Sequence, residues 1–417
     1  MEERYKLLGI TGPFEPQAFP VRLWDVFGQA GHPVRATIEG MGSLLLARLL
    51  DLNETQTGIL AIVFKVAKEK NWALIDLKDL QSLLKEVYDH SSEYSAQYGN
   101  ITKQSVGAIQ RSLLVLEQEG ADQFFGEPAL DLQDFMQLDS SGRGYINILS
   151  ATRLFHSPKL YSTFLIWMLS RLFETLPEVG DLEKPKFVFF FDEAHLLFKD
   201  ASKLFLEKVE QVVRLIRSKG VGIYFITQNP QDLPESVLAQ LGNRVQHALR
   251  AYTPKEMKAI KVAAQSFRPN PAFDTETVLT ELGTGEALVS FLNEKGQPSV
   301  VERSYILSPQ SSFDLLNESE QLALISTSPY HQKYAVRVDQ ESAYEKLAEK
   351  TNQEAEEKNK EQEAKEKAAE EKASQKRSPG RPRKSSLEKA KDSFISSLFR
   401  TIAREVAKLI MGSFKKK

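Results

Sequence analysis

The sequence contains no cysteine, which excludes disulfide bonds and cysteine-ligated metals and suits a reducing compartment. Its six histidines show no metal-ligand spacing, so we expect no structural zinc site. The most apolar window, residues 160–176, is interrupted by two serines, an arginine and a glutamate, which indicates a buried helix and not a membrane span. Residues 1–5 lack the basic-then-apolar form of a signal peptide. These absences predict a cytoplasmic protein.

Charge is distributed unevenly along the chain. The formal net charge is −2, but residues 376–417 carry 13 Lys and Arg against 3 Asp and Glu. The tail therefore has a net charge of +10, and residues 1–375 carry −12. A basic tail on an acidic body predicts that the tail meets an anionic partner, either nucleic acid or a lipid surface.

Composition and periodicity divide the 417 residues into six segments. Two extended runs, residues 21–26 and 33–38, flank a turn-rich loop and predict a hairpin. We expect the globular part to end near Leu315. The expected segments are an N-terminal hairpin region of the core (1–40), a helical subdomain (41–138), the main α/β core (139–315), an extension (316–340), a charged Glu/Lys/Ala helix or linker (341–375) and a basic tail with an amphipathic helix (376–417).

The most informative stretch joins a strand to two adjacent carboxylates. Residues 187–191 are five apolar residues typical of a strand buried on both faces of a parallel sheet, and Asp192 and Glu193 follow directly. A helix over about residues 201–218 and a strand over residues 221–226 come next, followed by Gln228. This order predicts a right-handed βαβ unit whose polar groups meet at the ligand-binding edge of the sheet. A core strand that ends in two solvated acids is the alternative.

Residues 19–307 resemble the YjgR-type branch of the bacterial HerA/FtsK-like ATPases. The resemblance implies an α/β, RecA-like P-loop NTPase core with a mostly parallel sheet, a helical insertion and a charged helical C-terminal tail. It also implies a ring, expected to be a hexamer, that couples ATP hydrolysis to DNA movement as a translocase or helicase. The matching stretches are residues 19–28, 53–56, 98–100, 184–198, 212–222, 227–230 and 240–250.

The resemblance assigns roles to the polar residues at the strand ends. Asp192 matches the Walker B aspartate, which binds Mg²⁺ through a water, and Glu193 matches the glutamate that polarises the attacking water. Gln228 matches the polar sensor that contacts the γ-phosphate or that water. The sequence Asp192-Glu193-Ala194-His195 also matches the Asp-Glu-Ala-His motif of DEAH helicases. Those helicases have Ser-Ala-Thr where this chain has Thr-Gln-Asn at residues 227–229. His195 is expected to be a structural or coupling residue.

Three arginines are further candidates for contact with nucleotide. Arg217 is the first choice for an arginine finger offered to the ATP of the next subunit, a role worth about 10³–10⁵ in rate. Arg214, one turn earlier, is its rival, and Arg250 lies in another matching stretch. For either helical arginine the alternative is a solvated helix face.

One departure from the family pattern concerns phosphate binding. The Walker A loop, Gly-x-x-x-x-Gly-Lys-Ser/Thr, cradles phosphates with backbone amides and a lysine, but this sequence has no Gly-Lys dipeptide. Residues 283–286, Gly-Thr-Gly-Glu, are no substitute, because no lysine follows. ATP and Mg²⁺ are the implied cofactors, and both need that loop for tight binding. Two interpretations stay open: a motor ATPase whose core is incomplete at its N-terminus, or a P-loop-less DNA-associated or assembly subunit without catalysis.

The basic tail contains two further signals. Gly380-Arg381-Pro382, flanked by basic residues, resembles an AT-hook, whose arginines lie in the narrow minor groove of A·T-rich DNA. Arg381, Arg383 and Lys384 are therefore DNA-binding candidates, and phosphate attraction needs only their charge. Apolar residues at helical spacing between Phe394 and Ile410 predict an amphipathic helix. It could dock on a partner, on copies of itself or on an anionic membrane, and we favour protein association.

Overall fold

The computed structural model describes residues 2–180, 182–198, 203–312 and 314–375. The chain forms two compact units, Met1–Glu349 and Lys350–Lys417, and each is described by itself. The predicted AT-hook, with Arg381, Arg383 and Lys384, and the predicted tail helix lie outside the described residues. No helix within the described ranges combines the length and the apolar character that a membrane crossing requires.

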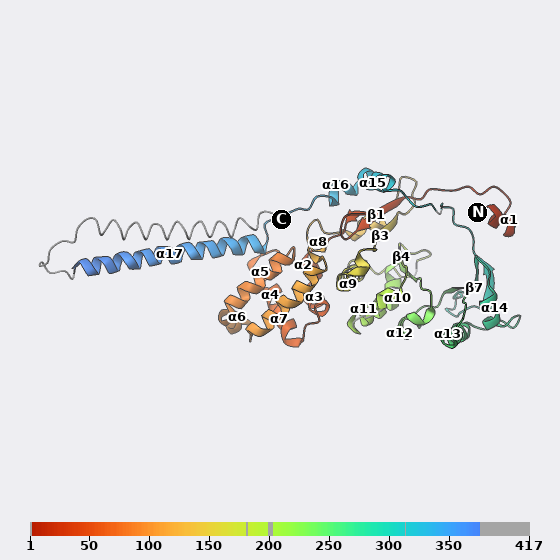
Figure 1. Cartoon of the computed structure of the whole chain (residues 1–417), viewed down its shortest axis with the longest axis horizontal. Coiled ribbons are helices and arrows are strands. Elements are labelled where there is room, and N and C mark those ends of the chain that lie inside the picture. Colours follow the sequence, from red (N-terminus) through yellow and green to blue (C-terminus); the bar gives the residue numbers. More distant parts are fainter. Residues whose placement is uncertain (1, 181, 199–202, 313, 376–417) are drawn as a thin grey trace. The chain divides into compact units, whose positions relative to one another are not determined.

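The first unit begins with a short helix, α1 (Glu2–Leu7), and a parallel sheet in the order β2-β1-β3 (Figure 1). β1 (Val21–Asp25) pairs with β3 (Ile146–Ser150) along its length, and β2 (His32–Pro33) pairs with β1 from the other side. The predicted hairpin is therefore wrong. The Asp25 carboxylate accepts hydrogen bonds from the backbone N–H groups of residues 27, 29 and 30, at 3.0, 2.8 and 2.9 Å. This loop brings the chain back beside β1 in a parallel direction.

Residues 38–136 are mainly helical, as the sequence predicts. Helix α4 begins with a capping box, in which Asn53 Oδ1 accepts from Gln56 N at 3.0 Å and Gln56 Oε1 accepts from Asn53 N at 3.1 Å. Helices α4, α5 and α7 pack against one another (Figure 1). The elements are α2 (Ile38–Met41), α3 (Ser43–Leu49), α4 (Glu54–Lys70), α5 (Leu77–Asp89), α6 (Ser91–Tyr98), α7 (Lys103–Gln118), α8 (Ala121–Phe124) and the 3₁₀ helix η1 (Leu132–Met136).

The predicted strand–helix–strand unit is confirmed. β4 (Phe187–Phe191) and β5 (Val221–Phe225) pair in parallel, with Phe191 opposite Phe225. The connecting helix α11 (Lys203–Leu215) continues as the 3₁₀ helix η3 (Ile216–Lys219) and ends at Gly220, whose φ of 73° suits glycine. Before and after β4 lie η2 (Leu154–His156), α9 (Pro158–Thr175) and α10 (His195–Phe198).

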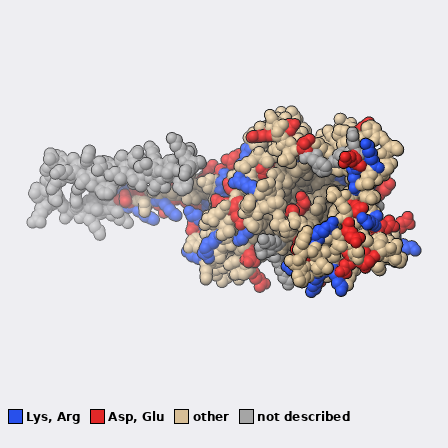
Figure 2. Space-filling view, turned by 45° about the vertical axis from the view of Figure 1, so that its right-hand side comes forward, with Lys and Arg blue, Asp and Glu red and all other residues tan. Residues whose placement is uncertain are grey.

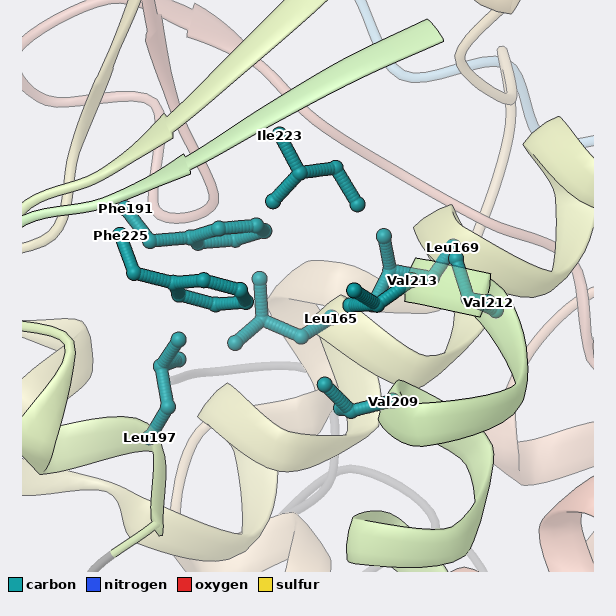
Figure 3. A pocket seen from close by; sticks show the side chains of 9 residues that line it. All are labelled: Leu165, Leu169, Phe191, Leu197, Val209, Val212, Val213, Ile223 and Phe225. Atoms are coloured by element: carbon teal, nitrogen blue, oxygen red, sulfur yellow. The ribbon is translucent and has the colours of Figure 1, made fainter. Parts of the chain in front are cut away.

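The two faces of the β4–β5 sheet differ. Phe191 and Phe225 point into an apolar core with leucines of α9 and α10 and valines of α11, and the void left there, about 10 Å³, is too small for a ligand (Figure 3). On the opposite face the rings of Phe190 and Tyr224 stack with centroids 4.6 Å apart and are 63% and 56% exposed. Burial of this strand on both faces is therefore not found among the described residues.

The next part of the first unit has its own sheet and a small core. β6 (Arg244–His247), β7 (Glu286–Ser290) and β8 (Glu302–Tyr305) form an antiparallel sheet in which β7 pairs with both neighbours. A second hydrophobic cluster holds this sheet to its two helices. The remaining elements are η4 (Pro230–Asp232), α12 (Glu235–Leu238), α13 (Pro254–Gln265) and α14 (Thr275–Glu281).

The globular part extends well beyond the predicted end near Leu315. α15 (Glu318–Thr327) contacts β1, and α16 (Tyr330–Tyr334) contacts β2. Tyr334 is fully buried, and its hydroxyl donates to the Asp134 carboxylate. The helix predicted over residues 341–375 is present as α17 (Ala343–Gln375), and its first residue is tied to Ala73 by a 2.9 Å backbone bond.

Candidate nucleotide-hydrolysis site

The polar residues at the ends of β4 and β5 lie together. Two backbone bonds join the strand ends: Ile226 N donates to Phe191 O at 2.9 Å, and Ala194 N donates to Ile226 O at 2.8 Å. Gln228 Nε2 then donates to Glu193 Oε1 at 3.0 Å. The parallel pairing thus brings together two side chains that are 35 residues apart in the sequence. This is the geometry expected when polar groups follow neighbouring parallel strands.

Glu193 has an uncommon backbone conformation. Its φ is 47°, in the left-handed region that non-glycine residues rarely adopt. The conformation is held by neighbours, because Glu193 N donates to Asp192 Oδ1 at 3.0 Å and the next residue, Ala194, is fully buried. Backbone strain of this kind is concentrated at functional sites. It orients the Glu193 carboxylate toward the end of β5.

His195 is the third side chain at this site. Its Nδ1 lies 3.1 Å from Glu193 Oε2, an ion-pair distance when the ring is protonated, although the orientation is not that of a hydrogen bond. Each Glu193 oxygen thus has a neighbour, Gln228 for one and His195 for the other. The sequence predicts a structural or coupling role for His195 and no partner for it. Only the fold identifies Glu193 as that partner.

Asp192 has donor chemistry that suits Mg²⁺, but it does not form a closed metal site. Within the described ranges no group of three or more His, Asp and Glu side chains could hold a metal ion. Asp192 therefore supplies at most a single carboxylate, which fits a contact through water better than a complete coordination shell. The carboxylates of Asp192 and Glu193 suit a contact with Mg²⁺ through water and the polarisation of a water molecule. They do not fit the phosphates, because the chain has no Gly-Lys loop.

The three arginine candidates lie at different places. Arg214 is on α11, in a surface hollow that it shares with Glu207 and Glu210, so the surroundings of its charge are partly acidic. Arg217 is exposed on η3. Arg250 donates to the carbonyl oxygens of Thr280 and Leu282, the latter at 2.8 Å, at the C-terminal end of α14. This capping engages the Arg250 guanidinium, and the nucleotide role of all three stays a prediction.

Fold and site together define a class: an α/β protein with two acids directly after one strand and a polar residue just after the neighbouring parallel strand. The family model described as "Helicase HerA-like C-terminal" matches residues 1–417. The chain therefore belongs to the HerA-like helicase family, and both the resemblance and the predicted α/β fold class are confirmed.

Curated relatives match over shorter stretches. The DNA double-strand break repair helicase HerA of Sulfolobus acidocaldarius is 31% identical over 99 residues, which are 24% of this chain and 19% of that protein. The probable helicase MJECL08 of Methanocaldococcus jannaschii is 31% identical over 120 residues, 28% of this chain and 21% of that protein. The chain thus spans about a fifth of the length of these relatives.

Two solved structures show remote similarity. The plasmid coupling protein TrwB in complex with ADP and Mg²⁺ has 11% identity and a TM-score of 0.46, over 72% of this chain and 74% of that chain. VirB4 of Thermoanaerobacter pseudethanolicus has 15% identity and a TM-score of 0.44, over 74% and 79%.

Proposed function

We propose that this chain is the water-activating part of a HerA-like ATPase that moves DNA, as a translocase or helicase, in a ring of several copies. The observation that carries the proposal is the 3.0 Å bond between Gln228 and Glu193 at the carboxyl ends of two parallel strands. Family membership supports the reaction class.

In the proposed site each residue has a separate task. Asp192 would hold Mg²⁺, and Glu193 would orient and polarise the attacking water. Gln228 fixes one carboxylate oxygen of Glu193, and His195 lies beside the other. Mg²⁺·ATP, when bound, supplies the electrophilic phosphorus. Arg217 of a neighbouring copy, or Arg214, would neutralise charge that develops on the phosphoryl group.

The test uses the in-frame gene sequence before the Met1 codon. If it encodes a strand and a Gly-x-x-x-x-Gly-Lys-Thr loop, the longer protein should hydrolyse ATP, and Glu193→Gln should abolish turnover while ATP binding persists. The matched control is Glu235→Gln, an exposed acid at the start of α12. Turnover that survives Glu193→Gln removes Glu193 from the mechanism.

The second candidate function is a non-catalytic, DNA-associated or assembly subunit. It is favoured by one observation, the lack of a Gly-Lys dipeptide in the 417 residues. Both candidates predict that the present chain binds ATP more weakly than micromolar, since no loop cradles the phosphates. Titration with a fluorescent ATP analogue measures this, and micromolar binding would contradict it. A stop codon directly before a ribosome-binding site in the gene favours the second candidate.

A further inference from the structure

Helix α13 has two faces of different chemistry. Ile260 and Ala263 are buried against the small core of the β6–β8 region. Lys255, Lys258 and Lys261 recur at three-residue spacing, are exposed and fall on the outward side of the helix. The outward face therefore has three positive charges within about two turns.

These lysines have no acidic partner among the residues that the structure describes. None of the three forms an ion pair with a described residue. The only acid of the helix, Glu256, is engaged at its N-terminus, where it accepts from Tyr252 N at 2.7 Å and Thr253 N at 2.8 Å. On the molecular face seen in Figure 2, acidic and basic side chains are interspersed. These three positive charges lie on a part of the chain, residues 1–375, whose net charge is −12.

An exposed aromatic ring lies just before the helix. Tyr252 is 89% exposed, so its ring is open to solvent two residues before α13 begins. Proteins that bind single-stranded nucleic acid combine positive charge along the backbone with aromatic rings on which bases stack. The lysines and Tyr252 supply both parts, which favours nucleic acid over other polyanions.

The position of α13 links it to the candidate site. The helix packs against η4, which begins two residues after Gln228. We propose that the outward face of α13, with Lys255, Lys258, Lys261 and Tyr252, binds the phosphate backbone of DNA next to the loop that positions Gln228. This inference rests on the proposed function and names a surface that would bind its DNA. The surface belongs to a different segment of the sequence from the basic tail.

The test measures DNA binding by the full chain without nucleotide. Fluorescence anisotropy with a labelled 20-base single strand and a duplex of the same length, over a salt series, gives the slope of log affinity against log salt. In Lys255→Gln/Lys258→Gln/Lys261→Gln the slope should fall by about 2–3, since each phosphate contact contributes about 0.7–0.9. The affinity at 100 mM salt should fall at least about tenfold. Tyr252→Ser should weaken single-strand binding about fivefold or more and duplex binding less.

The matched control is Lys358→Gln/Lys360→Gln/Lys367→Gln, three exposed lysines among the glutamates of α17, which should leave the slope within about 0.5. Circular dichroism and thermal melting check that each variant is folded. An unchanged slope in the α13 variant overturns the proposal, as does equal loss in the control. If the α13 variant loses binding to vesicles of anionic lipid but keeps its affinity for DNA, the proposal is also overturned. Because no ATP is present, failure of the ATPase proposal leaves this result interpretable.

Discussion

The β1–β3 sheet and the β4–β5 sheet are both parallel, but they are completed in different ways. Around β1 the core is closed by residues far along the chain: Trp24 is buried and has Tyr330 and Tyr334 as ring neighbours. The β4–β5 sheet instead presents Asp192, Glu193 and Gln228 at its strand ends. Both sheets have exposed apolar side chains on one face, Ile146 and Ile148 in the first and Phe190 and Tyr224 in the second. The first sheet, closed at Trp24 by a distant segment, therefore serves stability, whereas the second has open strand ends with a strained residue, where chemistry is proposed.

The largest effect is expected at the closed sheet. Tyr334→Ala removes a fully buried ring and its hydrogen bond to Asp134, so the free energy of unfolding should fall by about 3–5 kcal/mol. Tyr334→Phe keeps the ring and should lose about 1–2 kcal/mol. Urea titrations measure both. Equal small losses would show that α16 does not close this core.

A pH effect is expected from the same core. Burial, with nearby His331 and Arg22 contributing, lowers the pKa of His32 from its usual value near 6.5 to about 4. The unfolded chain therefore binds this proton first, so stability is lost as the pH falls from about 6.5 to about 4, by about 3 kcal/mol in total. His32→Phe keeps a ring against Trp24 and should make the urea midpoint less dependent on pH between 7 and 4. An equally steep profile in this variant would assign the acid sensitivity to other groups.

A smaller, stabilising effect is expected at the strand ends of the β4–β5 sheet. Glu193→Gly relieves the left-handed backbone, so it should be more stable than Glu193→Ala by about 1 kcal/mol. Both variants lack the carboxylate, so the difference between their free energies of unfolding reports the backbone strain at residue 193. Thermal melts of the pair measure it. If the alanine variant is the more stable, residue 193 is not strained.

The smallest effect is expected on the exposed face. Phe190→Ser/Tyr224→Ser removes two exposed rings and should change the free energy of unfolding by less than about 0.5 kcal/mol. Phe191→Ser, on the packed face, is the contrasting variant and should lose several times more. A loss above about 2 kcal/mol in the double variant would show that this face is covered.

Much of the local structure could be predicted from sequence. The capping box of α4, the stop of the α11–η3 helical segment at Gly220 and the strand–helix–strand order all depend on neighbouring residues. The hairpin prediction for residues 1–40 failed because the Asp25 carboxylate organises its loop through three backbone bonds, which no period-two pattern reveals. The end of the globular part was placed too early, because the buried residue Tyr334 lies among polar neighbours.

The sequence by itself determined the family, the two acids after an apolar strand and the lack of a Gly-Lys loop, since these are properties of residue order. Only the tertiary structure decided that His195 and Gln228 lie on the two oxygens of Glu193, that Arg250 caps α14 and that Phe190 is exposed. These facts depend on the pairing of segments distant in the chain. Such pairing is set by the packing of the whole core and not by any local pattern.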